Sequence, residues 1–140
     1  MTEKQFWMKL DQLSMKPMED AASAAKMALI IRSACEQGLR LLVACTVEDG
    51  ETKPFCIAKS EDERLIICYT SKEMAKSDKI EGSKELLSVR DIITMMRERP
   101  AVGGLIFNPQ NEKRMMAIPK LFFAQDTDEF AAQMERIMGK

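Results

Sequence analysis

The chain of 140 residues contains no histidine. Histidine is the side chain that most often acts as a general base near neutral pH, and it is the commonest metal ligand in proteins. Its absence excludes Ser-His-Asp and Cys-His catalysis within this chain. The carboxylates form no evident acid–base pair along the sequence, so we predict no catalytic residue.

Closely spaced cysteine pairs are also missing. None of the four cysteines belongs to a C-x-x-C motif, and each lies inside an apolar run. They are Cys35, Cys45, Cys56 and Cys68. We interpret them as reduced, buried thiols of a cytosolic protein. A zinc site or an inter-strand disulfide would require side chains from separate strands to converge, so we expect no metal and no cofactor.

Long apolar runs and a charge excess of one sign are absent as well. No uninterrupted apolar run approaches the roughly 18 residues of a membrane-spanning helix, and the N-terminal residues lack the apolar core of a signal peptide. Lys and Arg number 21, Asp and Glu number 22, and the two signs are interspersed. A nucleic-acid-binding face needs clustered basic residues. We therefore expect a soluble, cytoplasmic protein that binds neither membranes nor nucleic acid.

Helical periodicity is present at the start of the chain. Residues 2–13 have an apolar stripe that includes Phe6 and Leu10, with polar residues around it. Residues 18–37 are rich in alanine, and Gly38 is a suitable residue for the end of a helix. Both segments are predicted to be α-helices.

Six apolar runs separated by polar turns predict strands. They cover residues 39–47, 54–59, 65–69, 86–89, 105–108 and 114–118. The Asp-Gly pair between the first two runs is a strong hairpin signal, and the first three strands are predicted to form an antiparallel meander. The third strand is apolar throughout, which is typical of a central strand covered on both faces.

Capping motifs mark the helices between these strands. The spacing Thr70-x-x-Glu73 predicts a capping box in front of a short helix over 71–77, and Ser88-x-x-Asp91 predicts a second one. Together the elements predict an α+β fold with a mixed, mostly antiparallel sheet of about five to six strands and helices packed on it.

The chain is short enough for a single domain. We expect residues 1–37 to form a helical segment that packs on the core of an α+β domain formed by residues 38–140. A final helix capped at Asp126 is expected near the C-terminus. Twelve methionines are present, and they act either as adaptable core filling or as a soft surface that accepts partner helices.

Three short segments resemble the SseB N-terminal domain family, which is named for enhanced serine sensitivity. They are residues 69–73 (YTSKE), 86–89 (LLSV) and 104–109 (GLIFNP). The resemblance covers about residues 38–123. Most members of this family are intracellular bacterial proteins, and the family offers no established catalytic residue to carry over. The resemblance favours a non-enzymatic interaction or regulatory module that binds an unknown protein partner. If the N-terminal helix pairs with a second copy instead of docking on its own core, the protein forms a homodimer.

A polar rim is expected where two apolar strands end. If strands 65–69 and 105–108 are neighbours in the sheet, the residues that follow them lie close together at one edge. Main-chain N–H groups at the start of the following helix could hold an anion there. The predicted ligand-binding residues of this rim are Tyr69, Thr70, Ser71, Glu73 and Asn108.

The rim supports an alternative hypothesis, in which the protein is a small-ligand-binding domain or a cysteine-dependent enzyme. Cys68 is the only plausible nucleophile near the rim. Its thiolate would need activation by a lysine or a helix terminus, because no neighbouring base can be named. For that reason we favour the non-enzymatic module.

Overall fold

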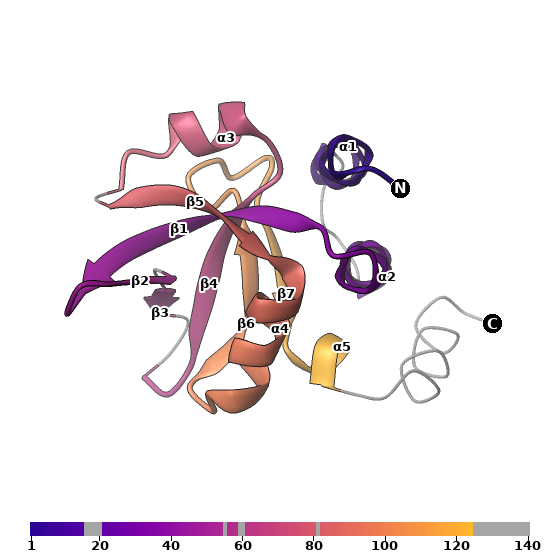
Figure 1. Cartoon of the computed structure of the whole chain (residues 1–140). Helices are drawn as coiled ribbons and strands as arrows, with labels where there is room; N and C mark the ends of the chain where they lie inside the picture. The colour runs from indigo at the N-terminus through magenta and orange to yellow at the C-terminus, as the bar shows by residue number, and fades with distance from the viewer. Residues whose placement is uncertain (16–20, 55, 59–60, 81, 125–140) are drawn as a thin grey trace.

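The computed structural model of the chain describes residues 1–15, 21–54, 56–58, 61–80 and 82–124 (Figure 1). The helices are α1 (Glu3–Ser14), α2 (Ala21–Glu36), α3 (Lys72–Ser77), α4 (Val89–Glu98) and α5 (Leu121–Ala124). The strands are β1 (Arg40–Glu48), β2 (Glu51–Pro54), β3 (Cys56–Ala58), β4 (Arg64–Tyr69), β5 (Ser83–Ser88), β6 (Val102–Phe107) and β7 (Met116–Pro119).

The seven described strands form one mixed sheet. β1 pairs with β5 along one edge, and its other edge pairs with β4 and β2. β4 is followed by β6 and then β7. Among the described strands, only the β4–β6 pair is parallel, and the other pairs are antiparallel. The predicted α+β fold with a mixed, mostly antiparallel sheet is therefore confirmed, with one strand more than expected.

The additional strand arises because the predicted return strand 54–59 is divided into β2 and β3. β2 pairs with β1 at Cys45 and Pro54, whereas β3 pairs with β4 at Cys56 and Ile66. β1 and β4 also pair directly with each other farther along. The return segment can therefore lie between β1 and β4 only where these two strands do not pair with each other. There β2 bonds to β1, and β3 bonds to β4. The simple meander that we predicted is wrong in this respect.

Two other strand boundaries differ from the prediction. β5 begins at Ser83 instead of at residue 86, because it pairs with six consecutive residues of β1. β6 begins at Val102 instead of 105, and Gly104 lies within its ladder. Gly104 has φ +156°, and a Cβ atom there would lie 2.2 Å from the carbonyl oxygen of Ile118. Only glycine allows β6 and β7 to approach in this way.

Alternating side chains along the strands bury both faces of the sheet, as expected for a central β4. One set, which includes Ile66, Cys68 and Phe107, packs beneath α1, α2, α4 and α5. We call this side the helix-rich face. The other set includes Ile67 and Tyr69 and packs beneath α3, and we call that side the α3 face. Figure 1 shows α1 and α2 side by side and α3 apart from them, above β1 and β5.

The first two helices add their apolar stripes to the core of the helix-rich face. Phe6 and Leu10 of α1 are fully buried there, as is Met27 of α2. The backbone N–H of Gln5 donates to the hydroxyl of Thr2, and the Gln5 side chain accepts from the Thr2 N–H, which forms a capping box. The N-terminal helical segment therefore shares one core with the sheet.

A short helix that the sequence pattern did not predict, α5, follows β7. α5 inserts Phe122 and Phe123 into the helix-rich face, where both are buried. The final helix that we expected from Asp126 lies outside the described residues. Among the described helices, none has the length and the apolar character needed to cross a lipid bilayer.

Candidate functional site

The parallel pairing of β4 and β6 brings the ends of these two strands together, as the rim hypothesis required. Cys68 pairs with Phe107, and the N–H of Asn108 donates to the carbonyl of Cys68 at 3.1 Å. The backbone N–H of Thr70 donates to Oδ1 of Asn108 at 3.2 Å, and Nδ2 of Asn108 donates to Oγ1 of Thr70 at 3.0 Å. Both residues are buried, and Asn108 has φ +53°. Asparagine tolerates this left-handed backbone better than most residues.

Residues far apart in the sequence complete this polar cluster. The hydroxyl of Thr70 donates to Oδ1 of Asp11 in α1 at 2.7 Å. The guanidinium of Arg114 forms an ion pair with the same carboxylate, and its Nε donates to Oγ of Ser14 at 3.1 Å. Nδ2 of Asn108 also donates to the carbonyl of Arg114 at 3.2 Å. The cluster therefore fastens α1 to the ends of β4 and β6.

An open groove lies beside this cluster, between α1 and the start of α3. Its volume is about 590 Å³. We call it the end groove, and its lining residues are Glu3, Lys4, Trp7, Met8, Asp11, Arg40, Thr70, Ser71, Lys72 and Leu86. Met8 is 49% exposed and Leu86 is 38% exposed, so apolar side chains face solvent there. The groove combines accessible apolar area with polar groups, as binding sites commonly do.

Some of the charged side chains in the end groove already form ion pairs within the protein. The guanidinium of Arg40 makes a two-pronged ion pair with Glu3, with N–O distances of 3.2 Å, and the indole Nε1 of Trp7 donates to the carbonyl of Arg40 at 2.9 Å. Asp11 is held by Arg114. Lys4 and Lys72 have no ion-pair partner among the described residues, which leaves the free charge of the groove positive.

The structure brings only part of the predicted rim to this groove. Thr70 and Ser71 line it. Tyr69 instead points into the α3 face, where its hydroxyl donates to Oδ2 of Asp78 at 2.7 Å. Glu73 is exposed on α3 and does not line the groove. Asn108 is fully buried, and its amide is bonded to Thr70 and to the carbonyl of Arg114.

The cap of α3 also differs from the prediction. Ser71, and not Thr70, is the N-cap residue, and its hydroxyl accepts from the N–H of Met74 at 3.1 Å. The helix begins at Lys72, which places Ser71 at the cap position, and the hydroxyl and N–H of Thr70 donate to Asp11 and Asn108 instead. Ser88, by contrast, caps α4 as predicted, accepting from the N–H of Asp91 at 3.0 Å.

Asp11, Ser14 and Arg114 are the members of the cluster that sequence reasoning missed. Asp11 is separated from Thr70 by 59 positions and from Arg114 by 103. No local pattern connects such distant residues. The one available signal was the position of Asp11 beside the apolar stripe of α1, where a charged side chain is half-buried and needs a partner.

The four cysteines are free thiols, as expected, but only Cys45 and Cys68 are buried. Burial raises the pKa of the Cys45 thiol to about 11. It raises the pKa of Cys68 further, with smaller contributions from Cys45 and Cys56. The side chain of Cys68 packs into the helix-rich core and does not line the end groove. Within the described part of the chain, no group of three or more cysteine or acidic side chains could hold a metal ion.

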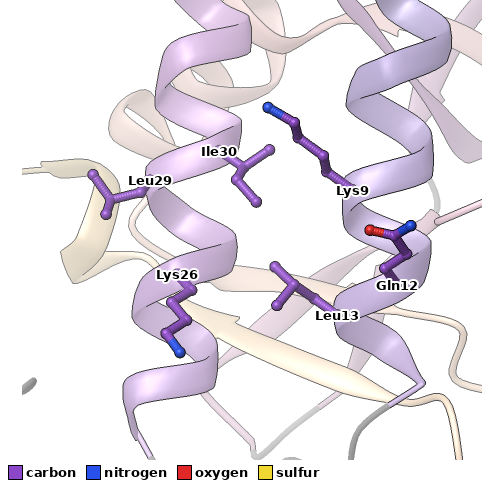
Figure 2. Close-up of a pocket in the computed structure, with 6 residues that line it drawn as sticks. All are labelled: Lys9, Gln12, Leu13, Lys26, Leu29 and Ile30. Atoms are coloured by element: carbon purple, nitrogen blue, oxygen red, sulfur yellow. The ribbon is translucent and has the colours of Figure 1, made fainter.

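A second depression lies on the outer side of α1 and α2. Its volume is about 420 Å³. Figure 2 shows Leu13 of α1 and Ile30 of α2 pointing toward each other across the gap, while Leu29 points away from α1. Lys9 and Lys26 stand at its margins. None of the predicted rim residues lines this second depression, so we take the end groove as the candidate site.

Comparison of the chain with protein-family models, with curated proteins and with solved structures found no match. The resemblance to the SseB N-terminal domain family therefore stays a prediction. We therefore infer the function from the residues that line the end groove.

Proposed function

We propose that the protein is a non-enzymatic interaction module that binds a segment of a partner protein in the end groove. The observation that carries this proposal is the exposure of Met8 and Leu86 beside the unpaired ammonium groups of Lys4 and Lys72. Exposed apolar side chains grouped at a groove are typical of interaction sites. The matching ligand is a peptide segment that carries apolar and acidic side chains.

The bonding of the polar groups supports binding over catalysis. Thr70 and Asp11 are bonded to each other, and the hydroxyl of Ser71 accepts from the start of α3. A nucleophile needs a neighbouring base that takes its proton. The Asp11 carboxylate is instead neutralised by Arg114. Cys68 is buried with a raised thiol pKa, which disfavours the thiolate that a cysteine-dependent enzyme requires.

A small-ligand-binding domain is the second candidate function. The volume of the end groove, about 590 Å³, lies within the range of roughly 300–1,000 Å³ that small-molecule sites occupy. A ligand of this kind would be an amphipathic anion, since Trp7 and Met8 offer apolar contacts and Lys4 and Lys72 offer positive charge. The openness of the groove to solvent favours the peptide segment.

The remaining expectations from the sequence belong to this proposal. We propose a cytoplasmic location, and we propose membership of the SseB N-terminal domain family on the strength of residues 69–73, 86–89 and 104–109. Formation of a homodimer is the competing form of interaction, in which the segment in the end groove would come from a second copy.

Selection of peptides from a random library on the immobilised protein tests the proposal. We expect the selected peptides to be enriched in acidic and large apolar residues. Trp7 is the single tryptophan of the chain and lines the end groove, so its fluorescence should shift when such a peptide binds. The variant Met8→Glu places a like charge against acidic peptides and should weaken binding at least about tenfold.

Leu29→Glu is the matched control, because Leu29 is also helical and is 45% exposed, close to the 49% of Met8. It lines the second depression and not the end groove. Peptides that lose affinity with Leu29→Glu and keep it with Met8→Glu would move the binding site to the α1–α2 surface. Selection of no binding peptide would contradict the interaction module itself.

A further inference from the structure

β5 forms an edge of the sheet. It pairs with β1 from Arg40 and Ser88 at one end to Cys45 and Ser83 at the other. No strand among the described residues pairs with the opposite side of β5. An exposed strand edge presents main-chain donors and acceptors to which another extended chain can bond.

The hydrogen-bond pattern identifies which groups of β5 point outward. The N–H of Val89 donates to the carbonyl of Leu39 at 3.0 Å, which continues the β1–β5 register by one pair. In an antiparallel ladder such bonded pairs alternate with non-bonded ones. Glu85 and Leu87 lie four and two positions before Val89, so they also belong to bonded pairs and bond to β1. The alternate residues Lys84 and Leu86 therefore direct their N–H and C=O groups away from β1.

The side chains of these two residues lie on the α3 face. Lys84 pairs with Ala44 and Leu86 with Leu42, both of which belong to the core of that face. Leu86 lines the end groove. Lys84 lines a neighbouring hollow of about 320 Å³. The free main-chain groups of β5 thus lie directly beside the proposed binding site.

Lysines predominate among the residues around the neighbouring hollow, which we call the basic hollow. Its lining residues are Leu42, Lys72, Ala75, Lys76 and Lys84, with three lysines and no carboxylate. Lys84 donates to the carbonyl of Asp78 through one N–H of its ammonium group. An ammonium group has two further N–H donors that a ligand can use. An acidic side chain placed beside Lys84 would also lie near Lys72 and Lys76. Charge complementarity of this kind favours an acidic partner.

We propose that a segment of a partner protein adds to β5 as a further strand of the sheet. Its main chain bonds to the outward groups of Lys84 and Leu86. Side chains alternate along a strand, so an acidic residue lies beside Lys84 and a large apolar residue two positions away lies beside Leu86. This inference rests on the proposed function and names the conformation and the chemistry of the ligand.

A second copy of the chain fits this edge less well. A symmetric antiparallel pair that uses all four outward groups places Lys84 opposite Leu86 of the other copy. Glu85, the residue between them, then lies opposite Glu85 of the other copy. Like charges directly opposite each other are destabilising. Charged residues on an edge strand are a common device against self-pairing. The partner is therefore a different chain.

Hydrogen exchange measured by NMR tests the proposal residue by residue. The probe is a short peptide that alternates threonine with aspartate and leucine. In the free protein the amides of Lys84 and Leu86 should exchange fast, and those of Glu85 and Leu87 slowly. Saturating peptide should slow exchange at Lys84 and Leu86 at least about tenfold, with little further change at the other two amides.

N-methylation of the peptide provides a control that leaves the protein unchanged. Methyl groups on alternate amides remove the donors that face β5 in one series and the outward donors in the other. One series should therefore lose binding and the other should keep it. Equal affinity of both series would overturn strand addition, while a shift of Trp7 fluorescence by both would leave the interaction module standing.

Protein variants at two positions sharpen the result. Lys84→Glu should weaken the aspartate peptide and strengthen one with lysine in its place. Leu86→Pro removes an N–H that β1 does not use, so it should weaken binding more than Leu86→Ala, which keeps that N–H. If the amides of Lys84 and Leu86 are already protected in free protein that has the mass of a dimer, a second copy occupies the edge and the proposal is wrong.

Discussion

The two faces of the sheet are covered very unequally. On the helix-rich face, four helices and the sheet bury a cluster of 24 described residues. On the α3 face, one helix of six residues and the side chain of Trp7 from α1 lie over a cluster of seven. The same strands supply both clusters, because successive side chains point to opposite faces. The difference therefore comes from what packs on the sheet and not from the strands themselves.

This contrast separates stability from binding. A large cluster beneath several helices supplies most of the hydrophobic free energy of folding, which scales with the apolar area removed from water. The thin cover of the α3 face leaves the end groove, the basic hollow and the edge of β5 open. We expect the helix-rich face to tolerate little change and the α3 face to carry recognition.

The largest expected effect comes from two neighbouring isoleucines on β4. Ile66 and Ile67 are both buried, but Ile66 packs on the helix-rich face and Ile67 on the α3 face. We expect Ile66→Ala to lower the free energy of unfolding by about 4 kcal/mol and Ile67→Ala by about 2.5 kcal/mol, because a short helix can move into a cavity more easily than four packed ones. Urea unfolding measures both.

Equal losses for the two variants would show that the faces contribute alike, and a larger loss for Ile67→Ala would reverse the comparison. Leu29→Ala is a suitable reference, because Leu29 is 45% exposed and its replacement should change stability by less than about 0.5 kcal/mol.

The next effect is expected at Asn108, where the two strand ends meet. Its side chain bonds to Thr70 and to the carbonyl of Arg114, and its backbone has φ +53°. Asn108→Ala removes these bonds and places a Cβ-bearing residue in a left-handed conformation without a compensating side chain. We expect a loss of about 3 kcal/mol in the free energy of unfolding.

Asn108→Gly distinguishes the two causes, because glycine accepts positive φ without strain. We expect it to be about 1 kcal/mol less destabilising than Asn108→Ala in chemical denaturation. If the glycine variant is as unstable as the alanine variant, the hydrogen bonds account for the whole effect and backbone strain for none.

The smallest effect is expected at Tyr69, which is bonded to Asp78 on the α3 face. Tyr69→Phe should lower the free energy of unfolding by about 2 kcal/mol, because a buried carboxylate loses a donor. Tyr69 is the single tyrosine of the chain. Burial, and after it the hydrogen bond to Asp78, raises the pKa of this phenol above its usual 10.0.

The sign of the pH dependence follows from that shift. The folded protein keeps Tyr69 protonated, whereas the unfolded chain releases its proton near pH 10.0. The contribution of Tyr69 is therefore complete below that pH and is lost as the pH rises further. Denaturant unfolding across this range should show a steeper decline for the wild type than for Tyr69→Phe. Parallel declines would mean that the buried thiols alone set the alkaline limit.

Much of the fold was predictable because local chemistry dominates it. The apolar run of β4, the Asp-Gly turn after β1 and the cap at Ser88 each act over a few residues, and the structure confirms them. The division of the return strand into β2 and β3 was not predictable. It depends on where β1 and β4 pair directly, which involves residues far apart in the chain.

The candidate site was predicted in part for the same reason. The convergence of Thr70 and Asn108 follows from two neighbouring strand ends, and the structure confirms it. The contribution of α1 could not be predicted. Asp11 meets Thr70 only after α1 has docked beside the sheet, and the cap of α3 is Ser71 instead of the predicted Thr70.

The sequence by itself determined which segments become strands and helices, since the periods of apolar residues and the capping side chains act within a few positions. Tertiary structure alone decided that β5 takes an edge, that α3 lies over the less covered face, and that α1 closes one side of the end groove. These outcomes depend on packing between distant segments, and no short stretch of sequence encodes such contacts.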